Sequence, residues 1–481
     1  MTMFAESFRR DAERDRRVPD NVGEEYDFVI VGGGSAGCVL ARRLSEVRDW
    51  RVLVLEAGAE EPPETSVPSF FTHGIVSDTA RVSVTRPQKN GAAPLGTLSV
   101  RGNVLGGTSA INGVIYTRGN KEDYRRLEHL GWGYGTVLPY FKKAEDNLDE
   151  DVASDTEHHG TGGPLSVQRL PYRDPSAVLI KTALLEQGFD DVHDINGASQ
   201  LGPTNRTSAF YYQTTTRHGR RMSTNRAYLE PVRGRANLHV VTRARVTRVD
   251  VVQGRAQAVH FDKHGVSRMV RATREVILSA GVIGSAQLLL LSGVGPKKHL
   301  TRVGIPVVLD LPVGRNLKDH VSVVGHVFTM KKGSNLVNDI EVHWADLELW
   351  NRTGDGPAGS FGPTAVGSFY RTKRQPPDDP RPDVQLQASG LALNLAWLPK
   401  LAQGCPAAIP DVAHYNLLHF LPVLVRPRSS GTVTLRSADP RRPPIVDLNL
   451  LDDKEDLAVL VDGLDFYTRK LASSRVFRKM G

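Results

Sequence analysis

Residues 26–58 read YDFVIVGGGSAGCVLARRLSEVRDWRVLVLEAG, and this stretch decides the class of fold. Residues 26–31 form an apolar run rich in β-branched and aromatic side chains, which is typical of a buried strand. A glycine-rich turn follows, and then Leu40 and Leu44 recur at the spacing of one helix face. Residues 51–55 form a second apolar run. The order of strand, glycine loop, helix and strand predicts a βαβ unit with two parallel strands.

The glycine loop of this unit has the spacing GxGxxG, made by Gly32, Gly34 and Gly37. The first glycine permits a tight turn, the second lets the backbone approach a diphosphate, and the third lets the helix pack close to the sheet. The helix N-terminus then presents free N–H groups to the phosphates. Glu56, at the end of the second strand, is placed to accept hydrogen bonds from a ribose. A glycine-rich turn without function is the alternative, but the agreement of all four parts favours a dinucleotide site.

The bulk composition narrows the class of protein. The chain has 481 residues, 40% of them hydrophobic, and a formal net charge of +8. Its basic residues are scattered among acidic ones, which argues against a nucleic-acid partner. No apolar run is long enough for a transmembrane helix. Two cysteines, Cys38 and Cys405, exclude a disulfide framework and a cysteine-based metal site. Residues 1–25 are charged and lack the apolar core of a signal peptide, so we expect a flexible leader and leave the localisation open.

Three further blocks follow the βαβ unit in a fixed order. They are GNVLGGTSAINGVIY at 102–116, VILSAGVIGSAQLLLLSGVG at 276–295 and PVGRNLKDH at 312–320. With residues 26–58, these blocks make the chain resemble the glucose–methanol–choline (GMC) oxidoreductases, and most closely their arthropod glucose dehydrogenase branch. The resemblance runs from about Tyr26 to Gly481. It implies a flavoprotein that oxidises the CH–OH group of an alcohol or sugar by hydride transfer to flavin N5, and then passes electrons to a quinone-like acceptor or oxygen.

The resemblance also implies which residues meet the cofactor. Gly106 and Gly107 would let the backbone approach FAD closely, because a side chain there would fill the space that the cofactor needs. Family members with covalent flavin carry a histidine at the position of Ile111, so we expect non-covalent FAD. No metal ligand is expected. The full set of expected cofactor-binding residues is Gly32, Gly34, Ser35, Gly37, Glu56, Ala57, Arg101, Val104, Gly106, Gly107, Thr108, Asn112, Gly113, Val246, Ala280 and Gly281.

A catalytic base is not assigned within the chain. Alcohol oxidation by hydride transfer needs a base within hydrogen-bond reach of the hydroxyl. In the family this base is a histidine in an H-P-x-G-T-like motif, which would lie beyond Gly481, so we expect the printed chain to stop before it. The histidines at 158–159, 193 and 218 lie in loop-like stretches without such a motif. Two alternatives therefore stay open: a non-catalytic flavin-binding protein, and an NAD-dependent dehydrogenase, against which the GGTSAIN block argues.

The expected fold class is α/β, as an α+β composite of two domains. A Rossmann-like FAD-binding domain is accompanied by a substrate-binding domain built on an antiparallel sheet. The expected ranges are 26–164 with 230–320 for the first domain, and 165–229 with 321–481 for the second. Residues 237–251 alternate like a pair of strands around a turn, short alternating runs after about residue 320 predict antiparallel strands, and residues 452–479 predict one or two helices.

Overall fold

The computed structural model describes residues 22–71, 77–90, 93, 95–323, 326–330, 344–389 and 416–480. The chain forms two units. Unit 1 comprises Met1–Val114, Arg221–Asp319 and Ser429–Asp452, and unit 2 comprises Ile115–Arg220, His320–Arg428 and Asp453–Gly481. These bounds differ from the expected ones at four places. Residues 115–164 and residue 320 belong to unit 2, where Glu145–Asn147 joins a small sheet. Residues 221–229 and 429–452 belong to unit 1, where Gly431 bridges to Leu317. Residues 1–21 of the expected leader, and Cys405, lie outside the described residues.

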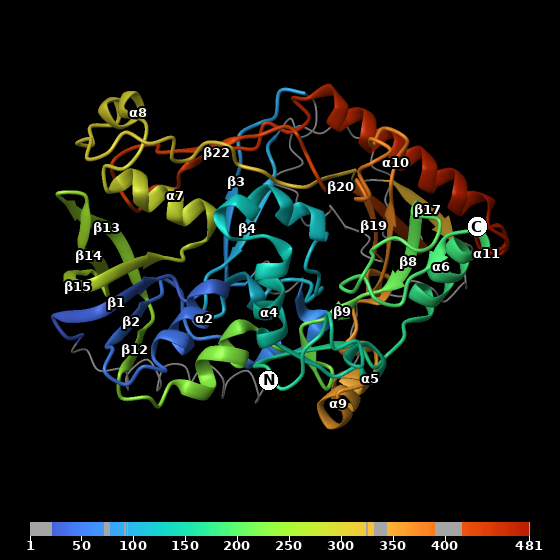
Figure 1. The fold of residues 1–481 in the computed structure, drawn as a ribbon, viewed down its shortest axis with the longest axis horizontal. Coiled ribbons are helices and arrows are strands. Elements are labelled where there is room, and N and C mark those ends of the chain that lie inside the picture. Colours follow the sequence, from blue (N-terminus) through green and yellow to red (C-terminus); the bar gives the residue numbers. More distant parts are fainter. Residues whose placement is uncertain are drawn as a thin grey trace. The chain divides into compact units, whose positions relative to one another are not determined.

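Unit 1 is built on a six-stranded sheet that contains the predicted βαβ unit. Its strand order is β12 (Leu238–Val241), β2 (Val52–Leu55), β1 (Glu25–Val31), β15 (Val266–Leu278), β14 (Arg255–Lys263) and β13 (Ala244–Val252). The first four strands run parallel and the last three form an antiparallel meander. Helix α2 (Ser35–Leu44) joins β1 to β2, as predicted (Figure 1).

One sequence interpretation of this sheet was wrong. Residues 237–251 form two strands, β12 and β13, but the two do not pair with each other. Strand β12 pairs with β2 at one end of the sheet, whereas β13 pairs with β14 at the other. A turn after a strand resembles a hairpin in sequence, but here both strands pair elsewhere, because β14 supplies a longer antiparallel ladder for β13.

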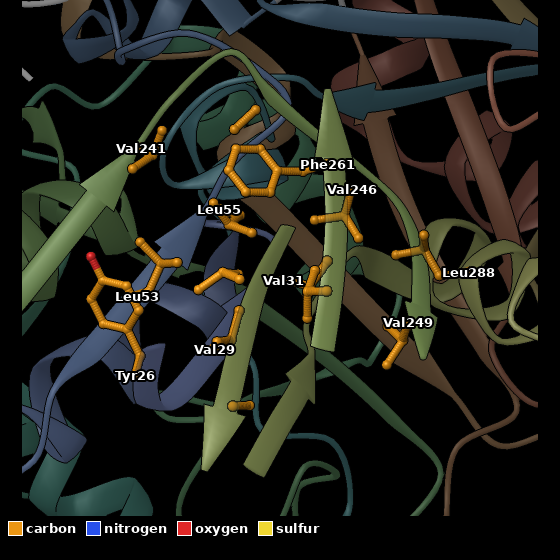
Figure 2. Packing of buried hydrophobic residues seen from close by; sticks show 14 residues of the cluster. Tyr26, Val29, Val31, Leu53, Leu55, Val241, Val246, Val249, Phe261 and Leu288 are labelled. Carbon is orange, nitrogen blue, oxygen red and sulfur yellow. The ribbon is translucent and has the colours of Figure 1, made fainter. Parts of the chain in front are cut away.

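The core of unit 1 lies against this sheet. Val29, Val31, Leu53 and Leu55 are at most 2% exposed, and they pack in one cluster with residues of β13, β14 and α7 (Gly281–Leu291) (Figure 2). Burying each such side chain contributes about 1.5–3 kcal/mol. Strands β1 and β2 are apolar on both faces because they are central strands of a parallel arrangement that is covered on both sides. This explains the near-continuous apolar runs in the sequence.

The remaining elements of unit 1 are short. They are η1 (Pro63–Ser66), η2 (Pro68–Phe70), β3 (Ala80–Val84), β4 (Leu98–Gly102), η3 (Gly107–Ala110), the π-helical turn η5 (Asn225–Leu229), η6 (Glu230–Val232), α8 (Lys297–Arg302), β21 (Thr432–Thr434) and β22 (Ile445–Asp447). Strand β3 pairs with β4, and β21 with β22, both antiparallel.

Unit 2 is built on a larger, mainly antiparallel sheet, as the alternating runs after residue 320 predicted. The strand order is β16 (Val321–Ser322), β20 (Asn416–Leu424), β19 (Val384–Ser389), β18 (Val366–Tyr370), β8 (Thr207–Tyr211) and β7 (Asp190–Asp191), and β17 (Val327–Met330) also pairs with β20. A second sheet joins β5 (Glu145–Asn147), β6 (Leu165–Arg169) and β9 (Gln213–Thr214). Two further short strands, β10 (Thr216–Arg217) and β11 (Arg220–Arg221), pair with each other.

Helices cover the larger sheet of unit 2. The helical elements of this unit are η4 (Lys121–Leu130), α4 (Tyr134–Ala144), α5 (Glu150–Ala153), α6 (Pro175–Glu186), α9 (Trp344–Thr353), η7 (Pro357–Gly359), η8 (Gly362–Ala365), α10 (Lys454–Ser473) and α11 (Arg475–Met480). The predicted helices at 452–479 are therefore confirmed. Gly463 of α10 lets the helix approach the sheet, since a Cβ there would come within 2.8 Å of Val384. Among the described residues, no helix is both long and apolar enough to cross a membrane.

Candidate cofactor-binding site

The glycine loop between β1 and α2 has the geometry that its spacing predicted. Gly32 has a φ of +102°, which only glycine adopts readily. A Cβ on Gly37 would lie 1.9 Å from the carbonyl oxygen of Gly32, so only glycine lets the helix start this close to the turn. Helix α2 starts after Gly34 without a side-chain cap. Its first N–H groups, together with the positive end of the helix dipole, are consequently available to an anion.

Glu56 is held in place by the backbone on both sides. The N–H of Gly33 donates to its Oε2 and the N–H of Gly58 to its Oε1, each at 2.7 Å. The residue is 8% exposed. Burial raises the pKa of Glu56, and the two backbone hydrogen bonds oppose that shift. A carboxylate has about four lone-pair positions, so Glu56 keeps acceptor capacity for further hydroxyl donors.

A cavity of about 620 Å³ brings most of the expected cofactor residues together within unit 1. Its size is within the usual range for small-molecule sites. Eleven of its lining residues were expected from the sequence: Gly32, Gly34, Ser35, Glu56, Ala57, Arg101, Gly107, Thr108, Val246, Ala280 and Gly281. The wall of the cavity includes residues from β1, α2, β2, β13 and α7.

Five expected residues do not line this cavity: Gly37, Val104, Gly106, Asn112 and Gly113. Gly37 packs behind the loop, as described above. Val104 is 1% exposed and packs with Ala110 and Ile111. Gly106 has a φ of +85°, and it starts the turn that leads into Gly107. Direct cofactor contacts of these residues stay a prediction.

A fully buried arginine fixes the segment that follows Gly107. Arg221 is 1% exposed, and its guanidinium donates to the carbonyl oxygens of Thr65 and Ser109 at 2.8 and 3.2 Å and to Oδ1 of Asn112 at 2.9 Å. Burial lowers the pKa of Arg221 to about 10, and Glu61 opposes that shift. Oδ1 of Asn112 also accepts from the N–H of Val114. Asn112 is therefore oriented by hydrogen bonds from two sides.

The cavity also contains residues that sequence reasoning missed. They include Arg81, Asn103, Arg245, Ser279, Val282, Ser285 and Gln287. Ser279 directly precedes the expected Ala280, and Arg245 directly precedes the expected Val246, so their neighbourhood was available from the sequence. Arg81 gave no such signal, because it lies in a strand far from the glycine loop along the chain and belongs to no motif.

A second buried polar cluster lies in unit 2 around His159, in a stretch that was predicted to be loop-like. Its side chain is fully buried. Nε2 of His159 lies 2.8 Å from Oδ2 of Asp194, and Nδ1 lies 3.2 Å from Oε1 of Glu145. Glu145 also pairs with Arg118 at 2.6 Å. Burial by itself would lower the pKa of His159, but the hydrogen bonds and charges of Asp194 and Glu145 outweigh it and raise the pKa to about 9. In the described part of the chain, no group of acidic, histidine or cysteine side chains could hold a metal ion.

Comparison with known proteins identifies the family. The sequence profile of the N-terminal part of GMC oxidoreductases matches residues 26–322, and the profile of the C-terminal part matches residues 427–480. The chain belongs to the GMC oxidoreductase family. The resemblance and the enzyme class predicted from the glycine-loop unit and the three later blocks are therefore confirmed. The expected mixed α/β fold with a Rossmann-like unit is confirmed as well.

Individual relatives of this GMC oxidoreductase are similar over most of its length. Glucose dehydrogenase [FAD, quinone] of Drosophila melanogaster is 38% identical over 476 residues, which cover 96% of this chain and 72% of the relative. Alcohol dehydrogenase [acceptor] of Pseudomonas putida is 34% identical over 471 residues, or 91% of this chain and 77% of the relative. The structure of a formate oxidase variant of Aspergillus oryzae superposes with a TM-score of 0.80 at 25% identity, covering 96% of this chain and 83% of that one.

Proposed function

We propose that this GMC oxidoreductase binds FAD without a covalent bond in the cavity of unit 1 and oxidises the CH–OH group of an alcohol or sugar. One observation carries the cofactor assignment. The free N-terminus of α2 and the fixed carboxylate of Glu56 line the same cavity of about 620 Å³. The N–H donors of α2 suit the diphosphate of a dinucleotide, and the carboxylate of Glu56 suits the hydroxyl groups of its ribose.

Each part of the cavity has a proposed role toward the cofactor. The first N–H groups of α2 and the Ser35 hydroxyl bind the diphosphate, and Glu56 accepts hydrogen bonds from the ribose. The backbone of Val246, in β13, contacts the adenine. Gly34 and Gly107 let their two backbone segments approach each other closely, since a Cβ on Gly107 would lie 2.7 Å from Cα of Gly34. We infer that FAD is bound without a covalent bond, because the buried aliphatic side chain of Ile111 has no atom that could form a bond with a flavin.

When bound, the flavin supplies two-electron chemistry by accepting a hydride at N5 from the carbon that carries the hydroxyl. The hydroxyl proton needs a base within hydrogen-bond reach. Among the described residues, no histidine lines the cavity. A non-catalytic flavin-binding protein is for this reason the second candidate, and cofactor binding and turnover have to be measured separately.

We assign the role of substrate surface to unit 2 and the role of cofactor binding to unit 1. The acceptor that we propose is a quinone-like compound, because a relative that is 38% identical is named for FAD and quinone. Oxygen is the alternative acceptor.

The experiment starts from purified protein of the printed sequence. We expect a yellow protein whose flavin is bleached without oxygen by glucose or by a simple alcohol, and re-oxidised by a quinone dye. Formation of hydrogen peroxide in air would show that oxygen, rather than a quinone, is the electron acceptor. A yellow protein that no sugar or alcohol bleaches would establish the non-catalytic alternative. A colourless protein that binds NADH and does not bind FAD would overturn the cofactor assignment.

A further inference from the structure

Three arginines meet in the cavity of unit 1. Arg81 lies on β3, Arg101 on β4 and Arg245 near the start of β13, and all three line the cavity. Arg81 and Arg101 are direct partners in the antiparallel β3–β4 pair. Residues directly opposite each other in such a pair project to the same face, and like charges in this arrangement destabilise the pair. Strands from distant parts of the chain thus bring three cations to one wall.

The protein itself supplies little charge compensation for these side chains. In the described part of the chain, neither Arg81 nor Arg101 forms an ion pair with a carboxylate. The Nε of Arg101 is buried without a hydrogen-bond partner, and its Nη2 reaches only Oγ of Ser83, at 3.5 Å. Burial, together with the charges of Arg245 and Arg101, lowers the pKa of Arg81 to about 10. Arg245 lies opposite Asp262 in the β13–β14 pair, but in the described part of the chain Asp262 forms its ion pair with Arg441 instead.

Partly buried guanidinium groups without carboxylate partners are a costly arrangement unless an anion joins them. We propose that Arg81, Arg101 and Arg245 form an anion clamp that binds the diphosphate of the dinucleotide, and that this clamp lets the protein bind ADP alone. The inference rests on the proposed function for the identity of the dinucleotide. It goes beyond the expected set of residues, because it gives Arg81 and Arg245 a role and makes charge, rather than the adenine surface, the main source of affinity for the ADP part.

The chemistry of the clamp favours a diphosphate. A guanidinium group forms paired hydrogen bonds with two phosphate oxygens, and such charge-assisted bonds are about twice as strong as neutral ones. The clamp lines the same cavity as Gly34 and Ser35, where α2 offers its N–H groups. A diphosphate bound in this cavity would have both the guanidinium groups and these N–H groups as donors. An uncharged adenosine would leave all three guanidinium groups without a partner.

The test is calorimetric titration of the full chain, freed of flavin, with ADP and with adenosine. We expect ADP to bind and adenosine to bind at least about a hundredfold more weakly. Arg81→Met and Arg245→Met should each weaken ADP binding about tenfold or more and leave adenosine binding unchanged. Arg81→Lys should keep part of the ADP affinity. The matched control is Arg48→Met, which removes an exposed arginine of unit 1 that does not line the cavity.

Two further readouts separate this inference from the proposed function. Raising the salt from about 50 mM to about 500 mM should weaken ADP binding more in the unmodified protein than in Arg81→Met, because screening acts on the charge that the variant lacks. The ligand-free Arg81→Met protein should melt no lower than Arg48→Met, since it loses a repulsion. ADP affinities equal to that of Arg48→Met in both Arg81→Met and Arg245→Met would overturn the clamp, even if FAD binds. Failure of the unmodified protein to bind FAD would instead overturn the proposed function.

Discussion

The buried His159 of unit 2 should make the stability of the protein fall as the pH rises. In the folded state its pKa is about 9, whereas the ordinary value is 6.5. The protonated ring lies between Asp194 and Glu145, which explains the direction of the shift. Because the folded pKa exceeds the unfolded one, this stabilisation is fully present below pH 6.5 and is lost as the pH rises through about 9.

The size of the effect follows from the shift. One pKa unit corresponds to 1.36 kcal/mol, so a rise from 6.5 to about 9 corresponds to roughly 3 kcal/mol. Between these two pH values, the free energy of unfolding should fall by about 1.4 kcal/mol per pH unit because of this group. This loss is a large fraction of the stability of an ordinary domain.

The assay is guanidinium unfolding at several pH values between about 6.5 and 9, for the unmodified protein, His159→Gln and His129→Gln. His129 is an exposed histidine of the same unit and serves as the matched control. At pH 6.5, His159→Gln should be less stable than the control by about 3 kcal/mol, and the two should converge toward pH 9. Parallel pH profiles for His159→Gln and His129→Gln would refute a protonated His159. If unit 2 does not unfold in one step, hydrogen exchange of its backbone gives the same comparison.

Three more predictions concern unit 1. Gly37→Ala places a Cβ 1.9 Å from the carbonyl oxygen of Gly32, so α2 must shift; flavin content after purification should drop at least about tenfold, and an unchanged content would show that the helix does not need this approach. Glu56→Gln turns an NH₂ donor toward a backbone donor such as the N–H of Gly33, and should cost about 1–3 kcal/mol, seen as a lower melting temperature together with weaker FAD binding; a variant that binds FAD normally would contradict the ribose role. Cys38 is fully buried and its pKa is raised to about 12, so iodoacetamide at about pH 8 should label its peptide only after unfolding, as read by mass spectrometry; labelling of the native protein would show that the α2 region opens.

The sequence was sufficient for the βαβ unit because its signals are local. The apolar runs of β1 and β2, the glycine spacing and Glu56 all lie within residues 26–58, and each corresponds to an element or contact of the structure. The same holds for α10, whose pattern extends over 20 residues. Local signals of this kind depend on the backbone and on neighbours a few positions away.

The parts that sequence reasoning missed depend on residues far apart in the chain. Strand β13 looked like the partner of β12, but it pairs with β14. Arg81 and Arg245 meet only because separate strands border one cavity. His159 lies in a stretch that was predicted to be loop-like, yet it is buried because Glu145 and Asp194 provide compensating charge. The spacing of residues along the chain carries no information about contacts between residues that are far apart in the sequence.

The central claim is that unit 1 binds FAD without a covalent bond, and the absorption spectrum of the purified protein tests it most directly. The account predicts the two visible bands of an oxidised flavin, and predicts that acid precipitation leaves all the flavin in the supernatant, because Ile111 offers no atom for attachment. A protein that stays colourless when FAD is added, or a yellow pellet after acid treatment, would contradict it.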